Sequence, residues 1–493
     1  MNSLTNDTVQ VLFEKIITES GILDQALVRD DNGFSLQVIR TFFNFIKEES
    51  AKDSRLTLAQ LIEMISRMIE NKLSLPLQLV TYKRPGVHFL TAHGAKGLEF
   101  SQVFVMGCGD KKWKSGRGTS NYTWPDNLVP MTQASSIEDD RRLFYVALSR
   151  TENHLQISYP LQNQDEKVES PLQFIFETGI TKDDVSEKQL DDQIILTYTA
   201  SQMRHVELGN VLINETLVDQ VLDNFQMSVT ALNKYLKCPL SFYFENILRV
   251  PMARIAAMGF GSAMHYAMEK LINAIERDPE RNIPEKSILL ESFKNGMKKY
   301  HSNFTQREFE DLTRYGVNCL DVYYDYHKRS LGRVDRFYPE KDISLTHAEG
   351  IPITGKLDRV DIFKDHIEVI DYKTGNSSSP YARKNIKPPI DENDPGGDYW
   401  RQIVYYKMLL QGEGKINTAN YLGYIDYLEP DKFGGLTKKH IEITDQDIAI
   451  VTDQLKDSWK KINDHVFEPG CGEEDCHWCN LVDEYKNTRD SQA

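Results

Sequence analysis

The sequence predicts an α/β fold with more than one domain. Two neighbouring runs, Leu357–Phe363 and Ile367–Lys373, alternate polar and apolar residues, which is typical of paired β-strands. Helical spacing of apolar residues dominates residues 1–85, and strand-like segments begin at Val87. A chain of 493 residues can bury ample core and should divide into roughly two to four domains.

Composition and charge exclude several classes of protein. Hydrophobic residues make up 40% and charged residues 27%, both ordinary for a globular domain. We expect no membrane segment or signal peptide, because no apolar run is long enough and MNSLTNDTVQ lacks basic and apolar regions. Six cysteines in so long a chain form no disulfide framework, which favours a reducing cytoplasm. The net charge of −15 argues against broad coating of duplex DNA, but not against a nuclease with local lysines and bound metal.

Residues 1–85 predict an all-helical subdomain. Its apolar residues at helical spacing are Val9, Leu12, Phe13, Ile16 and Ile17, then Leu58, Leu61, Ile62, Ile65 and Met68. From Val87, the block VHFLTAHGAKGLEFSQVFVMG predicts a strand, a glycine-bearing turn and a second strand. The block EDDRRLFYVALSRTENHLQISYP then predicts an amphipathic helix that ends near Arg150 and is followed by a strand.

Together these two blocks closely resemble motifs of the second RecA-like lobe of UvrD/Rep-type helicases, T-x-H-x-x-K-G-L-E-F and R-R-L-x-Y-V-x-x-[ST]-R. The resemblance implies that the residues of the nucleotide and DNA motifs are His93, Lys96, Gly97, Glu99, Arg142 and Arg150, of which Arg142 would position its helix. His93 would face DNA, Glu99 the nucleotide, and Arg150 the γ-phosphate, whose developing charge an arginine neutralises. The alternative for Arg150 is a cation that interacts favourably with a helix C-terminus.

The first lobe of such a motor is missing, because no G-x-x-x-x-G-K-[ST] occurs in the sequence. Residues 350–356 satisfy G-x-x-x-x-G-K, but Leu357 follows instead of Ser or Thr and the next element is a strand, so we reject this match. We therefore expect no ATP hydrolysis by this chain alone. ATP would bind only if a longer chain or a partner helicase subunit supplied the missing lobe.

A polar linker is predicted over residues 177–226, with one isolated strand, IILTYT. Ser228 is a suitable N-cap for the helix that Pro239 interrupts, and Ser262 for the next helix. The apolar stripe of that second helix consists of Met264, Met268, Leu271 and Ile275. His265 lies beside the stripe, where a histidine is more often a satisfied core residue than a ligand. Residues 280–345 read as helices.

The hairpin brings chemically useful side chains to one face of a sheet. Asp371 and Lys373 are two apart and so share a face, and Asp358 on the partner strand can be brought close to them. Two carboxylates beside an amine suit a divalent cation with oxygen ligands, magnesium rather than zinc. The alternative is that both acids lie at strand edges and that Lys373 is solvated.

The full run from Gly355 to Gly375 closely resembles the motif of the PD-(D/E)XK nuclease superfamily, in its RecB/AddB-like branch. Its pattern G-x-x-D-R-hydrophobic-D, a strand, then D-Y-K-T-G matches Asp358, Arg359, Asp361, Asp371, Tyr372 and Lys373. The resemblance implies a restriction-endonuclease-like α/β domain with a central mixed sheet. It also implies Mg²⁺ or Mn²⁺ held by Asp358, Asp371, the carbonyl of Tyr372 and, through G-x-x-x-H, His265.

The same resemblance assigns further residues around this centre. Lys373 would orient or help deprotonate the attacking water and stabilise the oxyanion. Gln402 and Tyr406 match Q-x-x-x-Y and share a helical face beside the centre. Glu340 is a candidate for an additional acid before the strands. In the polar stretch after Gly375, Arg383, Lys384 and Lys387 either reach the phosphates of a bound strand or are solvated.

Four cysteines form a one-plus-three arrangement. Cys471, Cys476 and Cys479 lie within nine residues near the end of the sequence, and Cys238 precedes the nuclease motif. Four thiolates are enough for a [4Fe-4S] cluster or a tetrahedral zinc. Such a cluster is implied by the RecB-like relatives that join the two ends of the nuclease domain in this way. Zinc or a vacant remnant is the alternative, because the spacing departs from the commoner version.

The sequence thus predicts a metal-dependent DNA nuclease within a helicase–nuclease of DNA repair or recombination. Its substrate would be single-stranded DNA or duplex ends. The predicted parts are a helical subdomain at 1–85, a second RecA-like lobe at 86–176, a linker at 177–226 and a nuclease domain at 227–485. The alternative is a non-catalytic DNA-binding or docking subunit that scaffolds a partner helicase.

Overall fold

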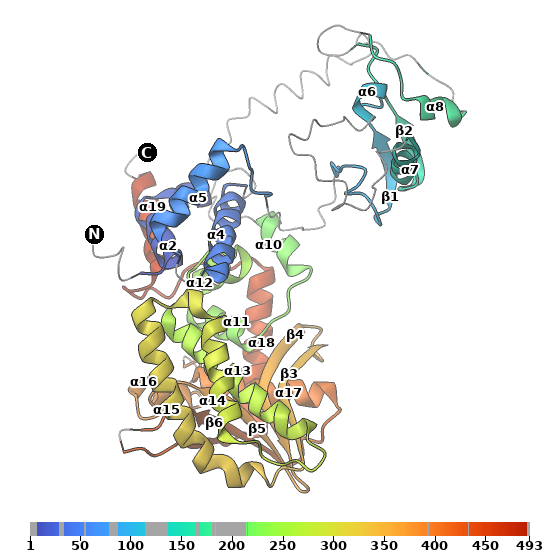
Figure 1. Cartoon of the computed structure of the whole chain (residues 1–493). Helices are drawn as coiled ribbons and strands as arrows, with labels where there is room; N and C mark the ends of the chain where they lie inside the picture. The colour runs from blue at the N-terminus through green and yellow to red at the C-terminus, as the bar shows by residue number, and fades with distance from the viewer. Residues whose placement is uncertain are drawn as a thin grey trace, which may run out of the picture. The chain divides into compact units, whose positions relative to one another are not determined.

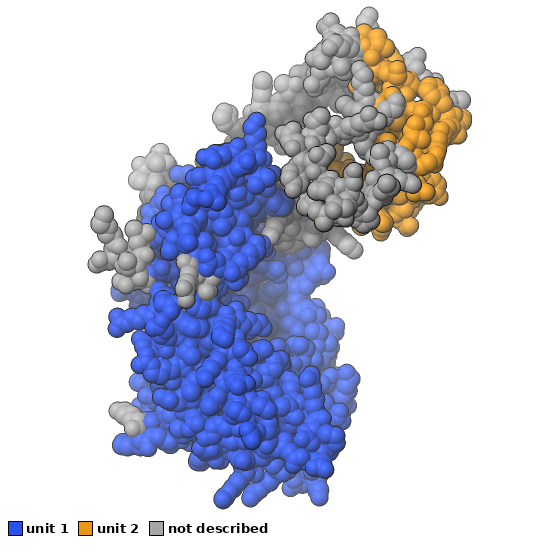
Figure 2. All heavy atoms as spheres, in the orientation of Figure 1, with its two compact units in different colours: residues 1–83, 206–493 blue, residues 84–205 orange. Residues whose placement is uncertain are grey.

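The computed structural model describes residues 7–28, 34–53, 56–77, 87–113, 137–162, 168–179, 183, 213, 215–391, 394–431 and 433–490. The chain divides into two compact units, shown in different colours in Figure 2. Unit 1 contains residues 1–83 and 206–493, and unit 2 contains residues 84–205. The helical residues before position 84 therefore cluster with the predicted nuclease region.

Unit 1 begins with helices, as the spacing of apolar residues predicts. They are α2 (Val9–Glu19), α3 (Ile22–Val28), α4 (Phe34–Lys52) and α5 (Leu58–Glu70). The first residues of α5 are fixed by a capping box, in which Thr57 and Gln60 satisfy each other's backbone N–H groups. Each of these helices therefore buries one face, and α2 and α4 contact each other.

Helices also precede the sheet of unit 1. They are α10 (Glu215–Leu222), α11 (Val229–Lys237), α12 (Pro239–Phe242), the π-turn η2 (Tyr243–Ile247), α13 (Ala256–Arg277), α14 (Lys286–Lys299), the 3₁₀ turn η3 (His301–Asn303) and α15 (Gln306–Leu331). In Figure 1, α13, α14 and α15 lie together in green and yellow, and contacts join them in sequence order. Ser228 caps α11, as predicted, because its side chain accepts a hydrogen bond from the N–H of Ala231.

A five-stranded mixed sheet forms the centre of unit 1, as the α/β prediction requires. Its strands are β3 (Arg336–Thr346), β4 (Pro352–Ile362), β5 (Ile367–Lys373), β6 (Tyr421–Tyr427) and β7 (Lys438–Ile441), in that order across the sheet. Neighbours are antiparallel except β5 and β6, which are parallel. The connection between these parallel strands contains α16 (Pro380–Asn385) and α17 (Asp398–Glu413), and α18 (Asp445–Asn463) and α19 (His477–Asp490) follow the sheet.

The two faces of the sheet pack against different helices. One core contains Val360, Val369 and Ile425 with residues of α17 such as Tyr405. The other contains Ile370 with residues of α13, α14 and α15. The predicted hairpin is confirmed, because β4 pairs with β5 in the register Arg359↔Ile370 to Ile362↔Ile367.

Two details of unit 1 differ from the prediction. Helix α13 begins at Ala256, so Ser262 lies inside it and donates its hydroxyl to the carbonyl of Met258 instead of capping the helix. The helix starts early because Ala256, a strong helix former, already packs against the core. Residues 280–345 are not helical throughout, since β3 begins at Arg336 and pairs with β4.

The described part of unit 2 is smaller. Its elements are β1 (Phe100–Val105), α6 (Asp110–Trp113), α7 (Ile137–Leu148), β2 (Thr151–Ile157) and α8 (Gln173–Glu177). Strands β1 and β2 are parallel, and a compact core contains Val105, Phe144 and Phe174. The helix predicted to end near Arg150 and the strand after it are both confirmed. The predicted strand IILTYT lies outside the described residues.

The first strand predicted after position 86 is wrong. Within the described part of unit 2, no strand pairs with residues 87–91, and Val87 and Phe89 each expose 82% of their surface. A strand needs a neighbour to satisfy its backbone N–H and C=O groups, and an alternating sequence cannot show whether that neighbour exists. No helix among the described residues is long and apolar enough to cross a membrane.

Candidate active site

Asp358 and His265 form the first pair of the candidate centre. Asp358 lies on β4, where its Oδ2 accepts the backbone N–H of Tyr372 at 2.8 Å. Its Oδ1 lies 3.4 Å from Nδ1 of His265 on α13. The two residues are far apart in sequence and meet because α13 packs on the sheet. His265 therefore faces the carboxylate, not the apolar stripe beside it.

The close approach of these groups shifts their pKa values. Burial lowers the pKa of His265, but the carboxylates of Asp358 and Asp371 outweigh burial and raise it to about 9. Burial would raise the pKa of Asp358, yet His265 and Lys373 bring it below its ordinary value. Asp371 is only 1% exposed, and burial raises its pKa. Asp371 therefore has a higher pKa than Asp358.

Asp371, Lys373, Gln402 and Tyr406 form a second, continuous set of contacts. The ammonium of Lys373 lies 2.8 Å from Oδ2 of Asp371 and donates to Oε1 of Gln402 at 2.9 Å. Nε2 of Gln402 donates to the hydroxyl of Tyr406 at 2.7 Å, and that hydroxyl lies 3.4 Å from Oδ1 of Asp371. Helix α17 therefore presents both residues of the Q-x-x-x-Y pattern to the strand that carries the acid and the lysine.

Glu340 joins the centre from β3. Ligand atoms of His265, Glu340 and Asp358 all lie within 4.8 Å of one another. Glu340 adopts a φ of 49° and its carboxylate lies 2.6 Å from the ammonium of Lys356. Two carboxylates and an imidazole are a donor set that fits a hard divalent cation. Asp371 is not in this group of three, so its part in holding the ion stays a prediction, as does that of the carbonyl of Tyr372.

A buried polar network lies on the other side of Tyr372. Arg359 donates to the hydroxyl of Tyr372 at 2.6 Å and to Oδ2 of Asp361 at 2.8 Å. Nearby, Tyr323 of α15 donates to Oδ2 of Asp426 at 2.6 Å. Arg359 and Asp361 belong to the sequence motif, whereas Tyr323 and Asp426 were not predicted. Because the N–H of Tyr372 binds Asp358, this network helps fix the backbone that positions the acid.

The four predicted cysteines lie together. Sγ of Cys238 is 3.8 Å from those of Cys476 and Cys479, and Sγ of Cys471 is 3.7 Å from that of Cys479. Burial would raise the pKa of Cys238, but hydrogen bonds from Ser241 and Cys471 lower it to about 7. A Cβ on Gly470 would lie 2.3 Å from Sγ of Cys479, so only glycine fits there. Four convergent sulfurs can hold a metal or cluster, whose type stays open.

The residues of the helicase-type motifs lie in unit 2. His93, Lys96 and Glu99 are exposed, and Gly97 has a φ of +85°. The guanidinium of Arg150 donates to the carbonyls of Leu98 and Val146, each at 3.0 Å. Arg142 forms an ion pair with Asp139 on the same helix, at 3.4 Å. These contacts are local, so the roles implied for DNA and nucleotide stay predictions.

Comparison with protein families gives two matches. Residues 226–483 match the model of the PD-(D/E)XK nuclease superfamily, and residues 7–162 match that of the UvrD-like helicase C-terminal domain. The first match contains every residue of the candidate centre and the four clustered cysteines. The second contains the motif residues of unit 2 and also helices α2 to α5.

Individual relatives are distant. A subunit of an ATP-dependent helicase/deoxyribonuclease from Thermoanaerobacter sp. (strain X514) is 26% identical over 254 residues, 46% of this chain and 21% of the relative. The putative ATP-dependent DNA helicase YjcD of Bacillus subtilis (strain 168) is 32% identical over 91 residues, 18% of this chain and 11% of the relative. The chain thus spans about a fifth or less of these relatives. A solved putative exonuclease from Eubacterium rectale covers 54% of this chain and 90% of its own, at 11% identity and a TM-score of 0.34.

Proposed function

We propose that this chain, which belongs to the PD-(D/E)XK nuclease superfamily, hydrolyses phosphodiester bonds of DNA with a divalent metal ion. The observation that carries the proposal is the convergence of His265, Asp358, Asp371 and Lys373 from α13, β4 and β5. Their mixture of oxygen, imidazole and ammonium groups suits a hard cation beside a phosphate. We infer Mg²⁺ or Mn²⁺ as the ion.

Asp358, His265 and Glu340 would hold the ion, with Asp371 and the carbonyl of Tyr372 completing the set. The bound ion would lower the pKa of a water and neutralise charge on the scissile phosphate. Burial lowers the pKa of Lys373, but Asp371 and Asp358 outweigh burial and raise it above the ordinary value. Lys373 therefore acts as an ammonium that donates to a phosphate oxygen and stabilises the developing charge.

Gln402 and Tyr406 would position the catalytic groups. Gln402 accepts from Lys373 and donates to Tyr406, so it fixes the direction of the ammonium. Tyr406 contacts Asp371 and the carbonyl of Lys356, so it links the acid to β4. Removing either residue would leave the charged groups in place but less well oriented.

The larger assembly is also a proposal. The relatives named as subunits of an ATP-dependent helicase/deoxyribonuclease support a role in a helicase–nuclease, which would act on single strands or duplex ends during DNA repair or recombination. The exposed apolar side chains of β1 and its flank, Phe104 at 54% and Met106 at 64%, support a further lobe or partner that covers this part of unit 2. ATP would bind only when that lobe is present.

A cleavage assay tests the nuclease proposal. The purified chain is incubated with labelled single-stranded DNA in Mg²⁺, in Mn²⁺ and in excess EDTA. We expect cleavage with either ion and none with EDTA. Cleavage that survives EDTA, or the substitution Asp371→Ala or Lys373→Ala, would contradict the proposal. DNA binding without cleavage by the unaltered chain would favour the docking role instead.

A further inference from the structure

The connection between β5 and α17 exposes three cations close to one another. Arg383 and Lys384 lie on α16, and Lys387 follows that helix. With Ile390, Asp394 and Gly396 they line a pocket of about 380 Å³. We call this the α16 cluster. Among the residues that the structure describes, no ion pair or hydrogen bond engages these three basic side chains, although the chain as a whole carries a net charge of −15.

Asp394, the acid that lines the same pocket, accepts hydrogen bonds from the backbone of its own loop. Oδ2 of Asp394 accepts the backbone N–H of Ile390 at 3.0 Å, and its Oδ1 accepts that of Gly396 at 3.0 Å. These backbone hydrogen bonds lower the pKa of Asp394. Asp394 therefore shapes the loop, and its carboxylate neutralises the cluster only in part.

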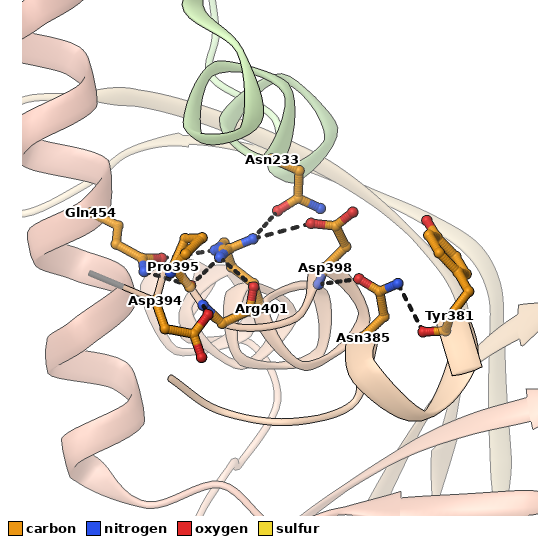
Figure 3. A network of polar contacts seen from close by, with 9 residues as sticks. Asn233, Tyr381, Asn385, Asp394, Pro395, Asp398, Arg401 and Gln454 are labelled. Atoms are coloured by element: carbon orange, nitrogen blue, oxygen red, sulfur yellow. Dashed lines mark hydrogen bonds and ion pairs between the residues drawn. The ribbon is translucent and has the colours of Figure 1, made fainter. Parts of the chain in front are cut away.

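A buried arginine fixes the base of this loop. Arg401 of α17 is 1% exposed and donates to the carbonyls of Pro395 and Gly396. Figure 3 shows its guanidinium between Asn233 on α11 and Gln454 on α18, to which it donates at 2.6 Å and 2.7 Å. Three helices therefore hold the loop through one side chain.

Short contacts also join α16 to the start of α17. Asn385 donates to the carbonyl of Tyr381 at 3.0 Å and accepts the N–H of Asp398 at 3.1 Å. The N–H of Gly397 donates to the carbonyl of Lys387 at 2.9 Å. A Cβ on Gly397 would lie 2.2 Å from the carbonyl oxygen of Asn385, so the approach requires glycine. The α16 cluster is therefore held on a fixed backbone, so binding requires no large rearrangement of the main chain.

Two aromatic side chains connect the cluster to the candidate centre. The ammonium of Lys373 lies 4.7 Å from the ring centroid of Tyr399, at the start of α17. The ring of Tyr399 meets that of Tyr381 edge to face, with centroids 6.1 Å apart. Tyr381 is 62% exposed and belongs to α16 itself. Side-chain contacts therefore lead from Lys373 through Tyr399 to Tyr381, which shares α16 with Arg383 and Lys384. We treat these residues, together with Lys387, as one surface.

We propose that this surface binds single-stranded DNA on one side of the scissile phosphate. Arg383, Lys384 and Lys387 contact consecutive backbone phosphates, and Tyr381 stacks on a base. Cations follow a phosphate backbone in either form of DNA, but an exposed ring can stack only on a base that is free of its duplex. The inference rests on the proposed nuclease function, because that function places a phosphate beside Lys373.

Binding is tested without cleavage. The full chain with Asp371→Asn is titrated with fluorescein-labelled poly-dT by anisotropy over a range of salt concentrations. Adding Arg383→Ala, Lys384→Ala and Lys387→Ala should weaken binding about 50-fold near 0.15 M salt, because each lost phosphate contact releases about 0.7 counterion fewer. The slope of log K against log salt should become shallower by about 2.

A matched control removes the same charge elsewhere. Lys294 and Lys298 of α14 and Arg329 of α15 are exposed and lie on helices that pack on the other face of the sheet. Changing these three to Ala should leave both affinity and salt slope as in the parent. Equal losses in the control and the α16 variants, or no loss in the latter, would overturn the proposal.

A separate experiment tests whether Tyr381 stacks on a base. Tyr381→Ala should weaken binding to poly-dT by about fivefold or more with an unchanged salt slope, and Tyr381→Phe should restore it. A duplex of the same length should not respond to Tyr381→Ala, and an equal loss there would overturn the assignment to single strands. Because anisotropy needs no cleavage, these outcomes are independent of the cleavage assay, in which the nuclease proposal fails if Asp371→Ala remains active.

Discussion

The candidate nuclease centre and the helicase-type motifs differ in how far their side chains are buried and in how many elements they contact. In unit 1, Asp358, Asp371 and Lys373 have low exposure and contact residues from several elements. In unit 2, His93 and Glu99 are exposed, and among the described residues Arg150 donates hydrogen bonds to Leu98, Val146 and Ser149. A site whose geometry is fixed by its own fold can act without further ordering, whereas the helicase-type site that the resemblance implies would need a second lobe to complete it. We therefore expect only the first to function in this chain.

The largest expected effect is on an acid of unit 1. Asp358→Asn keeps the size of the side chain but removes the charge that pairs with His265. We expect cleavage of single-stranded DNA to fall at least about a thousandfold, roughly 4 kcal/mol of transition-state stabilisation. The control Asp342→Asn changes an exposed acid on neighbouring β3 and should retain activity. Similar losses in both variants would show that the effect is not specific to the centre.

Lys373→Met tests whether the ammonium stabilises the transition state. It keeps the length of the side chain, and we expect kcat to fall about 100- to 1,000-fold, as when one donor to a developing oxyanion is removed. Single-turnover cleavage at saturating DNA measures the chemical step. A change confined to KM would instead assign Lys373 to binding.

The cysteine cluster should contribute to the stability of unit 1. Cys471→Ser removes one of four convergent sulfurs, and we expect the free energy of unfolding to fall by roughly 3 kcal/mol if the site is filled, since metal binding adds to folding free energy. Thermal unfolding of anaerobically purified protein, with metal analysis, measures this. Cys319→Ala is the control, because Cys319 is buried outside the cluster. An equal decrease in both variants would indicate an empty site.

A smaller effect is expected from the positioning pair. Tyr406→Phe removes the hydroxyl that contacts Gln402 and Asp371 without removing the ring. The loss of hydrogen bonds of about 1 kcal/mol should slow cleavage roughly fivefold to tenfold. Cleavage rates across a range of Mg²⁺ concentrations provide the measurement. A loss as large as that of Lys373→Met would give Tyr406 a direct chemical role.

The smallest effect is expected in unit 2. Arg150→Ala should change cleavage of short single strands by less than about twofold, because its three donors all reach neighbouring groups of the same unit. Initial rates beside the parent chain provide the measurement. A marked loss of cleavage would show that unit 2 contributes to the nuclease reaction. It would contradict the expectation that only the centre in unit 1 functions in this chain.

Local pattern was enough to predict the hairpin and the helix carrying His265. Alternation in Leu357–Phe363 and Ile367–Lys373 reflects which face of a strand is buried, a property encoded within a few residues. The same alternation failed at residues 87–91, because pairing depends on distant residues. Ser262 failed as a cap because a helix can start earlier wherever its preceding residues also pack.

Some contacts of the centre depend on long-range packing: the sequence named Glu340 as a candidate acid without its partners, and it gave no sign of Arg401 or Asp426. Glu340 reaches His265 only because β3 pairs with β4, and its own segment reads as helix. Arg401 resembles an ordinary charged residue in YWRQIVYY, yet its partners come from α11 and α18. Asp426 meets Tyr323 across more than a hundred residues. Spacing along the chain carries no signal for such contacts.

The distance in sequence between Cys238 and its partners has a consequence during synthesis. Cys238 meets thiols that lie more than 230 residues later, on and just before α19. A nascent chain cannot form this contact until residue 479 has emerged from the ribosome. The residues of the candidate centre, from His265 to Tyr406, are translated before these thiols. A nascent chain therefore contains the whole candidate centre before the four cysteines can come together. Contacts between residues so distant in the chain also form slowly, and we therefore expect the meeting of these thiols to be a late step in assembly of the domain.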